Sequence, residues 1–173
     1  WTTLTSDADD GVNSDVEILS LQYATESDHI YFRIETEADA DLSDSTFGIL
    51  LDDTSNTDQT NEAACHTRRV GGNDWGYVSE WDSGAGAWTP NNYAGSTHVR
   101  ANNGDFSGVD LACNLADFGF TFSYGNDKAA AVSGDVGGNA FMSQWITDNT
   151  PTGGNGMDDI TSYTDVPEFS SLL

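Results

Sequence analysis

Apolar and polar positions alternate along short segments of the chain, and clusters of Gly, Asn, Asp and Ser separate these segments. The clearest case is residues 29–35, in which Ile30, Phe32 and Ile34 alternate with polar residues. A period of two residues is typical of a β-strand with one face buried and the other in water. No long segment has the 3.6-residue period of a helix. The sequence therefore predicts an all-β chain.

Further segments show weaker forms of the same pattern. Residues 26–28 are typical of a hairpin turn, and residues 114–118 of a single helical turn. The alternation slips between Ile18 and Leu19, which predicts a β-bulge. Short strands separated by turn residues indicate a β-sandwich. The further predicted strands are residues 16–23, 46–51, 63–70, 75–81, 97–101, 109–115, 129–133 and 141–146.

The length and the aromatic content predict one folded domain. A chain of 173 residues is long enough to bury a substantial core. Its 8 Phe, 6 Tyr and 5 Trp separate it from disordered acidic chains, which have few aromatic residues. No internal repeat or linker is apparent. We expect a β-sandwich domain over residues 1–165 and a C-terminal tail over residues 166–173, which is either the remnant of an anchor or a donated strand.

The chain is strongly acidic, with 29 Asp and Glu against 5 Lys and Arg and a formal net charge of -24. An acidic tail would concentrate these residues in one block, but they are spread along the whole chain. This distribution favours a protein adapted to multimolar salt, where charges are screened beyond roughly 3 Å. The scarcity of cationic side chains argues against nucleic acid and anionic membranes as partners. Divalent cations remain plausible ligands.

Several features predict export. No stretch approaches the 18 apolar residues of a membrane-spanning helix, and no signal segment opens the chain. A processed exported protein would show neither, and a chain that begins with Trp1 rather than Met is consistent with such processing. Cys65 and Cys113 lie in predicted strands, and a disulfide between them would contribute roughly 4 kcal/mol through the entropy of the unfolded chain. Two buried thiols are the alternative. No CxxC or paired Cys/His spacing indicates a metal site at these cysteines.

The order of several motifs resembles that of DOMON-like domains related to family 9 carbohydrate-binding modules. Residues 15–35 resemble the opening hairpin, with Ile-Tyr-Phe-Arg-Ile after a Ser-Asp turn. The other matching segments are residues 47–56, 75–88, 109–118 and 145–151. The family's opening Asp-Gly and Asp-Trp segment is missing before Trp1, and residues 166–173 resemble the anchor region of archaeal surface proteins without the membrane helix. Processing of a cell-surface protein from a halophilic archaeon would explain both ends.

The resemblance implies an antiparallel jelly-roll-like β-sandwich, a fold used in this group for sugars, for haem and for structural calcium. Calcium prefers oxygen ligands clustered on a loop. Two acidic loops supply such ligands, although solvated turn carboxylates are the alternative in so acidic a chain. The first loop contains Asp52, Asp53, Asn56 and Asp58, and the second contains Asp7, Asp9 and Asp10. Haem is not expected, because no motif supports an axial pair among the Met and His residues.

Sugar binding needs exposed aromatic faces beside hydrogen-bonding side chains. Aromatic residues and asparagines cluster within about twenty residues of the chain. The candidate sugar-binding residues are Trp75, Tyr77, Trp81, Trp88 and Tyr93. The alternative is that some of them belong to the core, because we expect that Trp75, Tyr77 and Trp81 do not all share a strand face with Trp88.

No catalytic motif is present: the chain lacks G-x-S-x-G, H-E-x-x-H and a phosphate-binding glycine loop. Paired carboxylates could hydrolyse glycosides, but 29 acidic residues produce such pairs by chance. We therefore expect a non-catalytic extracellular or cell-surface structural protein. It would be a calcium-stabilised adhesin or a subunit of a filament or layer that self-associates through sheet edges or termini. A carbohydrate-binding module that recognises polysaccharide is the alternative.

Overall fold

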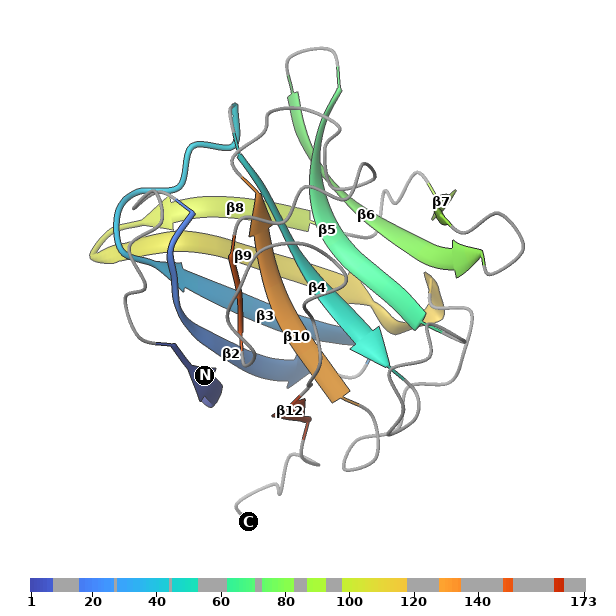
Figure 1. Ribbon diagram of the computed structural model, residues 1–173, viewed down its shortest axis with the longest axis horizontal. Helices are drawn as coiled ribbons and strands as arrows, with labels where there is room; N and C mark the ends of the chain where they lie inside the picture. Colours follow the sequence, from blue (N-terminus) through green and yellow to red (C-terminus); the bar gives the residue numbers. More distant parts are fainter. Residues whose placement is uncertain are drawn as a thin grey trace.

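In the computed structural model the chain folds into two antiparallel β-sheets that pack face to face (Figure 1). The structure describes residues 1–7, 16–26, 28–43, 45–52, 62–70, 73–82, 87–92, 98–117, 128–134, 148–150 and 164–166; among these, residues 52, 62–64, 68–70, 73–82, 87–92, 148–150 and 164–165 are described by their backbone alone. The all-β prediction is confirmed, and the helical turn predicted near residue 115 is a single 3₁₀ turn, Leu115–Asp117.

The first sheet has five strands in the order β1-β2-β3-β9-β8. The predicted hairpin turn joins β2 to β3, where Glu26 pairs with His29. The predicted bulge in β2 is also present, as a register shift between Ile18 and Ser20. The strands are β1 (Thr2–Ser6), β2 (Ile18–Glu26), β3 (His29–Thr36), β8 (His98–Asn103) and β9 (Phe106–Asn114).

The second sheet has the described order β11-β10-β4-β5-β6-β7, with β12 also pairing with β10. Its strands are β4 (Thr46–Asp52), β5 (Glu62–Val70), β6 (Asn73–Asp82), β7 (Ala87–Asn92), β10 (Lys128–Gly134), β11 (Asp148–Thr150) and β12 (Thr164–Asp165). Most predicted strands are confirmed, whereas the prediction over residues 141–146 lies outside the described residues. The alternation pattern missed β7, which contains Pro90 and lies at the end of the described strand order, where proline is tolerated.

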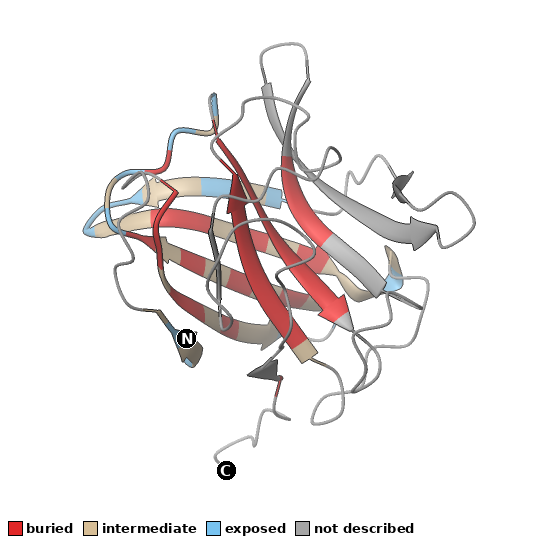
Figure 2. Cartoon of the chain, in the orientation of Figure 1, coloured by how far each residue is buried: buried red, intermediate tan, exposed pale blue. Residues whose placement is uncertain are grey.

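The core lies between the two sheets. Phe32 of β3 and Phe47 and Ile49 of β4 are fully buried in it, and Figure 2 shows buried residues along both layers. The second sheet is also buried on its other face at β4 and β10, because Leu50 and Val132 are fully buried although they alternate with core residues. A strand that is buried on both faces has a continuous apolar run, which is the pattern of residues 48–51.

A bulged corner fixes the register of β8 and β9. Asn102 has a positive φ of 44°, and its side chain donates to the Ala40 carbonyl and accepts from the Ala40 and Gly108 amides at 2.9–3.0 Å. Gly108 has a φ of 133°, and a Cβ at this position would lie 2.0 Å from the carbonyl oxygen of Ile34. These contacts tie the loop after β3 to the β8–β9 hairpin and hold β9 against β3.

Candidate functional site

The register of the second sheet brings the predicted sugar-binding residues together. Trp75, Tyr77 and Trp81 occupy alternate positions of β6, which fall on one face of the strand. Trp81 pairs directly with Trp88 of β7, so that both positions share this face. This corrects the expectation that these residues would not all share a face with Trp88. Tyr93 lies outside the described residues.

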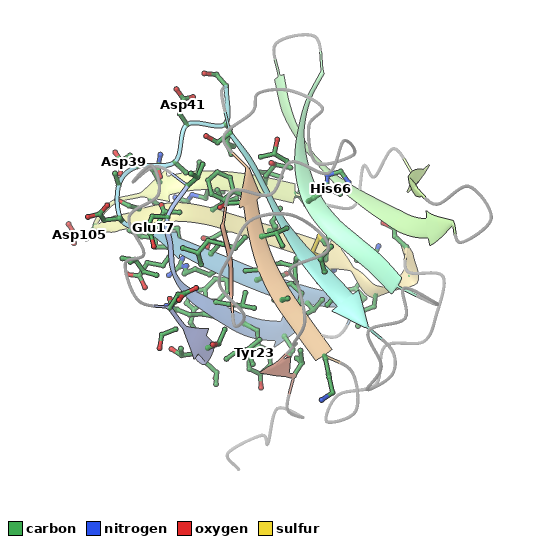
Figure 3. All side chains as sticks on the ribbon, viewed as in Figure 1. Glu17, Tyr23, Asp39, Asp41, His66 and Asp105 are labelled. Atoms are coloured by element: carbon green, nitrogen blue, oxygen red, sulfur yellow. A yellow bond between two sulfur atoms is a disulfide. The ribbon has the colours of Figure 1, made fainter. Side chains whose placement is uncertain are left out.

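We call positions 75, 77, 81 and 88 the aromatic row. Cys65 of β5 faces the core, so the neighbouring His66 is on the opposite face of the second sheet, and Tyr77 pairs with His66. The row therefore lies on the face of the second sheet that points away from the five-stranded sheet. His66, labelled in Figure 3, is buried, and its Nδ1 lies 2.9 Å from the Thr67 carbonyl oxygen. The row thus borders a covered part of this face.

The outer face of the five-stranded sheet carries a second feature, which the sequence pattern did not predict. Thr3, Gln22, Arg33, Asp110 and Arg100 pair in register across all five strands. We call this line the polar row. Thr3 and Arg100 are exposed, and the three residues between them are half-buried. With strands about 4.8 Å apart, the row is roughly 19 Å long.

Arg33 is the centre of the polar row. Its Nε and Nη2 donate to Oδ1 and Oδ2 of Asp110 at 2.7 and 2.9 Å, a two-pronged ion pair in which each side chain is about one-fifth exposed. The guanidinium carbon also lies 4.3 Å from the ring centroid of Trp1 and 4.1 Å from that of Phe106, within cation–π range. The hydrogen bonds to Asp110 raise the pKa of Arg33, so the guanidinium stays charged.

Polar contacts around Arg33 order its neighbours on the same face. Ser20 donates to a Glu35 carboxylate oxygen at 2.8 Å, and Gln22 donates to the Ser20 hydroxyl at 3.1 Å. Tyr31 donates to Glu26 at 2.9 Å, and this hydrogen bond raises the pKa of the phenol. The sequence could not reveal this face, because the cross-strand pairs come from strands separated by up to 77 residues.

The predicted calcium loops lie mostly outside the described residues. Asp52 is at the end of β4, where it pairs with Glu62 and Lys128, but its side chain is not described. Asp7 is described, and its amide donates to the Leu19 carbonyl at 2.9 Å. The remaining predicted ligands, Asp9, Asp10, Asp53, Asn56 and Asp58, fall outside the described ranges. Within the part of the chain that the structure describes, no group of three His, Cys, Asp or Glu could hold a metal ion.

Other acidic side chains gather at the end of the molecule where the loop after β3 meets the β8–β9 turn. Figure 3 labels Asp39 and Asp105 at this end. The Ser107 hydroxyl donates to Asp39 at 2.7 Å, and the Asp41 carboxylate accepts from the Ser43 amide at 2.8 Å. The Asp41 bond is a local turn contact, whereas the Asp39 bond ties the loop after β3 to β9, 68 residues further along the chain.

The predicted disulfide is confirmed. Cys65 of β5 and Cys113 of β9 are bonded, with their Cα atoms 6.2 Å apart. Both are fully buried in the core. The bond therefore joins the second sheet to the five-stranded sheet.

The chain matches no protein-family model, no curated protein and no solved structure. The resemblance to DOMON-like domains therefore stays a prediction. Among the described residues, no helix is long and apolar enough to cross a membrane.

Proposed function

We propose that this protein is a non-catalytic, extracellular or cell-surface β-sandwich of the jelly-roll type that acts as an adhesin by binding polysaccharide through the aromatic row. The observation that carries the proposal is the register of β6 and β7, which puts Trp75, Tyr77, Trp81 and Trp88 on one face. Flat aromatic rings in line provide stacking surfaces for the apolar faces of sugar rings. The resemblance to carbohydrate-binding modules supports the same function.

The charge of the chain favours a neutral polysaccharide. The formal net charge is -24, so an anionic polymer bound to this protein would lie close to carboxylates of the surface. Molar salt screens repulsion over longer distances but less at direct contact. Stacking of apolar surfaces does not depend on charge, so it persists in the high salt to which this composition is suited. The buried disulfide supports an oxidising, extracellular setting. We also propose that calcium stabilises the loop that begins at Asp52.

Co-sedimentation with insoluble neutral polysaccharides in multimolar NaCl tests this function. Replacing Trp75, Trp81 or Trp88 by Ala should each weaken binding roughly tenfold or more, as truncation of a buried aromatic anchor does. Thr89→Ala is the matched control, because Thr89 neighbours Trp88 on β7 but occupies a position on the other face, opposite Glu80. Folded variants that all bind like the wild type would exclude the row as the binding surface.

A second candidate is a subunit of a surface filament or layer. The observation that favours it is β8, the last strand in the order of the five-stranded sheet among the described residues, on which His98, Arg100 and Asn103 are exposed. An accessible sheet edge is a template for strand addition by another copy. Electron microscopy and light scattering in molar salt, with and without a calcium chelator, separate the two candidates. Ordered assemblies that loosen on chelation support the subunit, whereas an 18.5 kDa monomer under all conditions excludes it.

A further inference from the structure

We infer that the outer face of the five-stranded sheet is a binding surface for neutral polysaccharide in its own right, with Trp1 as its stacking residue and the polar row as its hydrogen-bonding track. The inference shares the class of ligand with the proposed function but concerns a different face and different residues. Together, the two surfaces would make one molecule a cross-linker of polysaccharide chains.

Trp1 is exposed and its ring contacts the five-stranded sheet at Arg33. Trp1 is 52% exposed, and within the described ranges it is the one large hydrophobic residue that is exposed. Strand pairing begins at the next residue, where Thr2 pairs with Tyr23, and the indole lies 4.3 Å from the guanidinium carbon of Arg33. Arg33 is itself fixed by its two bonds to Asp110. A ring that already contacts Arg33 loses less conformational entropy when a ligand stacks on it than a ring without such a contact would.

The polar row supplies hydrogen-bonding groups in a line. Each of three strands contributes one group: Thr3 has a hydroxyl, Gln22 an amide whose Nε2 also donates to Ser20, and Arg100 a guanidinium whose Nη2 also donates to Asn103. Arg33 and Asp110 bond to each other between them, and the rings of Trp1 and Phe106 pack on Arg33, so the centre of the row is ordered by its own contacts. Sugar hydroxyls both donate and accept hydrogen bonds, which suits this mixture of groups.

Small residues border the row on two of its strands. Ala112 and Gly108 flank Asp110 on the same face of β9, and Ala24 and Ser20 flank Gln22 on β2. These neighbours are short, and the bulky residue of β9 on this side, Phe106, packs on the Arg33 guanidinium, so an extended polymer along the roughly 19 Å of the row would meet Phe106 beside Trp1. The acidic residues close to the row, such as Glu35, again favour a neutral polymer over an anionic one.

The two surfaces lie on opposite sides of the sandwich. The polar row is on the face of the five-stranded sheet that points away from the core, and the aromatic row is on the outer face of the second sheet. Figure 1 shows the two sheets as separate layers. Two surfaces that face in opposite directions favour contacts with two different chains over contacts with one.

The experiment uses the full chain in multimolar NaCl with three soluble neutral polysaccharides, namely a mannan, a β-glucan and an α-glucan, and with polygalacturonate as the anionic comparison. Binding is measured by sedimentation, and cross-linking by light scattering as the ratio of protein to polymer is varied. The variants are Trp1→Ala, Arg100→Ala and Trp81→Ala. Thr2→Ala is the control, because Thr2 neighbours Trp1 and is exposed.

We expect Trp1→Ala to weaken binding about tenfold and to abolish the scattering maximum at intermediate ratios, with Thr2→Ala unchanged. Arg100→Ala should weaken binding about threefold and leaves the Trp1–Arg33 stack in place, so it tests the surface even if Trp1→Ala displaces β1. Loss of binding in Trp1→Ala and Arg100→Ala but not in Trp81→Ala would support this surface and overturn the proposed function. Loss in Trp81→Ala alone, or binding of polygalacturonate alone, would overturn the inference.

Discussion

Removing the disulfide tests how the two sheets are held together. The bond joins β5 to β9, and both cysteines are fully buried. Replacing either cysteine by Ala removes the whole cross-link, so the two single variants and the double variant should lose the same main contribution to stability. We expect the double variant to be only slightly less stable than either single variant.

The size of the effect follows from the chain that the bond closes. Cys65 and Cys113 are separated by 48 residues, and closing a loop of this length removes unfolded-state entropy equivalent to about 4 kcal/mol at 25 °C. The two deleted sulfur atoms also leave small voids in the core, which add to the loss. A loss of this size is a large fraction of the roughly 5–15 kcal/mol of a typical domain.

Urea unfolding in molar NaCl, followed by tryptophan fluorescence, measures this loss. The variants should unfold at lower urea with a steeper dependence on urea concentration, because an unfolded chain without the cross-link exposes more surface. Ala112→Ser, next to Cys113 but on the solvent side of β9, is the control for substitution in this strand. A double variant within about 1 kcal/mol of the wild type, or single effects that simply add, would refute the reasoning.

Three further predictions concern stability, each measured by the same urea unfolding. Gly108→Ala should lower the free energy of unfolding by about 4 kcal/mol or prevent folding, because its Cβ would lie 2.0 Å from a backbone oxygen. Gly104→Ala is the control: space around Gly104 is open, so this variant should lose only about 1 kcal/mol, from its positive φ. A double-mutant cycle with Arg33→Gln and Asp110→Asn should give a coupling of about 1–2 kcal/mol that persists in molar salt, since the pair is mostly buried; zero coupling would contradict the ion pair. Burial raises the pKa of Tyr23, so the contribution of this residue to the free energy of unfolding is complete below roughly pH 10 and is lost as the pH rises through the folded-state pKa. Tyr23→Phe should therefore make the free energy of unfolding fall less steeply at alkaline pH.

Regular alternation made most of the fold predictable. The pattern of Ile30, Phe32 and Ile34 identified β3, and the slip after Ile18 identified the bulge in β2. β1 was not predicted, because Leu4 is its one large apolar residue and cannot by itself establish a period of two. The double burial of β4 explains why its run was apolar rather than alternating.

The candidate sites were less predictable, because they depend on pairing between distant strands. Local alternation places Trp75, Tyr77 and Trp81 on one face of a strand, but only the β6–β7 register shows that Trp88 joins them. The polar row has no local signal at all, since its central pair, Arg33 and Asp110, is separated by 77 residues. The disulfide could be predicted, because a chain with only two cysteines has one possible intramolecular pairing.

The most direct test of the proposed adhesin function measures two quantities on the same protein, the variant in which Trp75, Trp81 and Trp88 are all replaced by Ala. If the aromatic row is a binding platform, the affinity for neutral polysaccharide falls at least tenfold, while the free energy of unfolding changes by no more than about 1 kcal/mol per substitution. If the row instead belongs to a second apolar layer beside the buried His66, each substitution lowers the free energy of unfolding by about 3–5 kcal/mol. That loss of stability, with no binding by the wild type, would contradict the account.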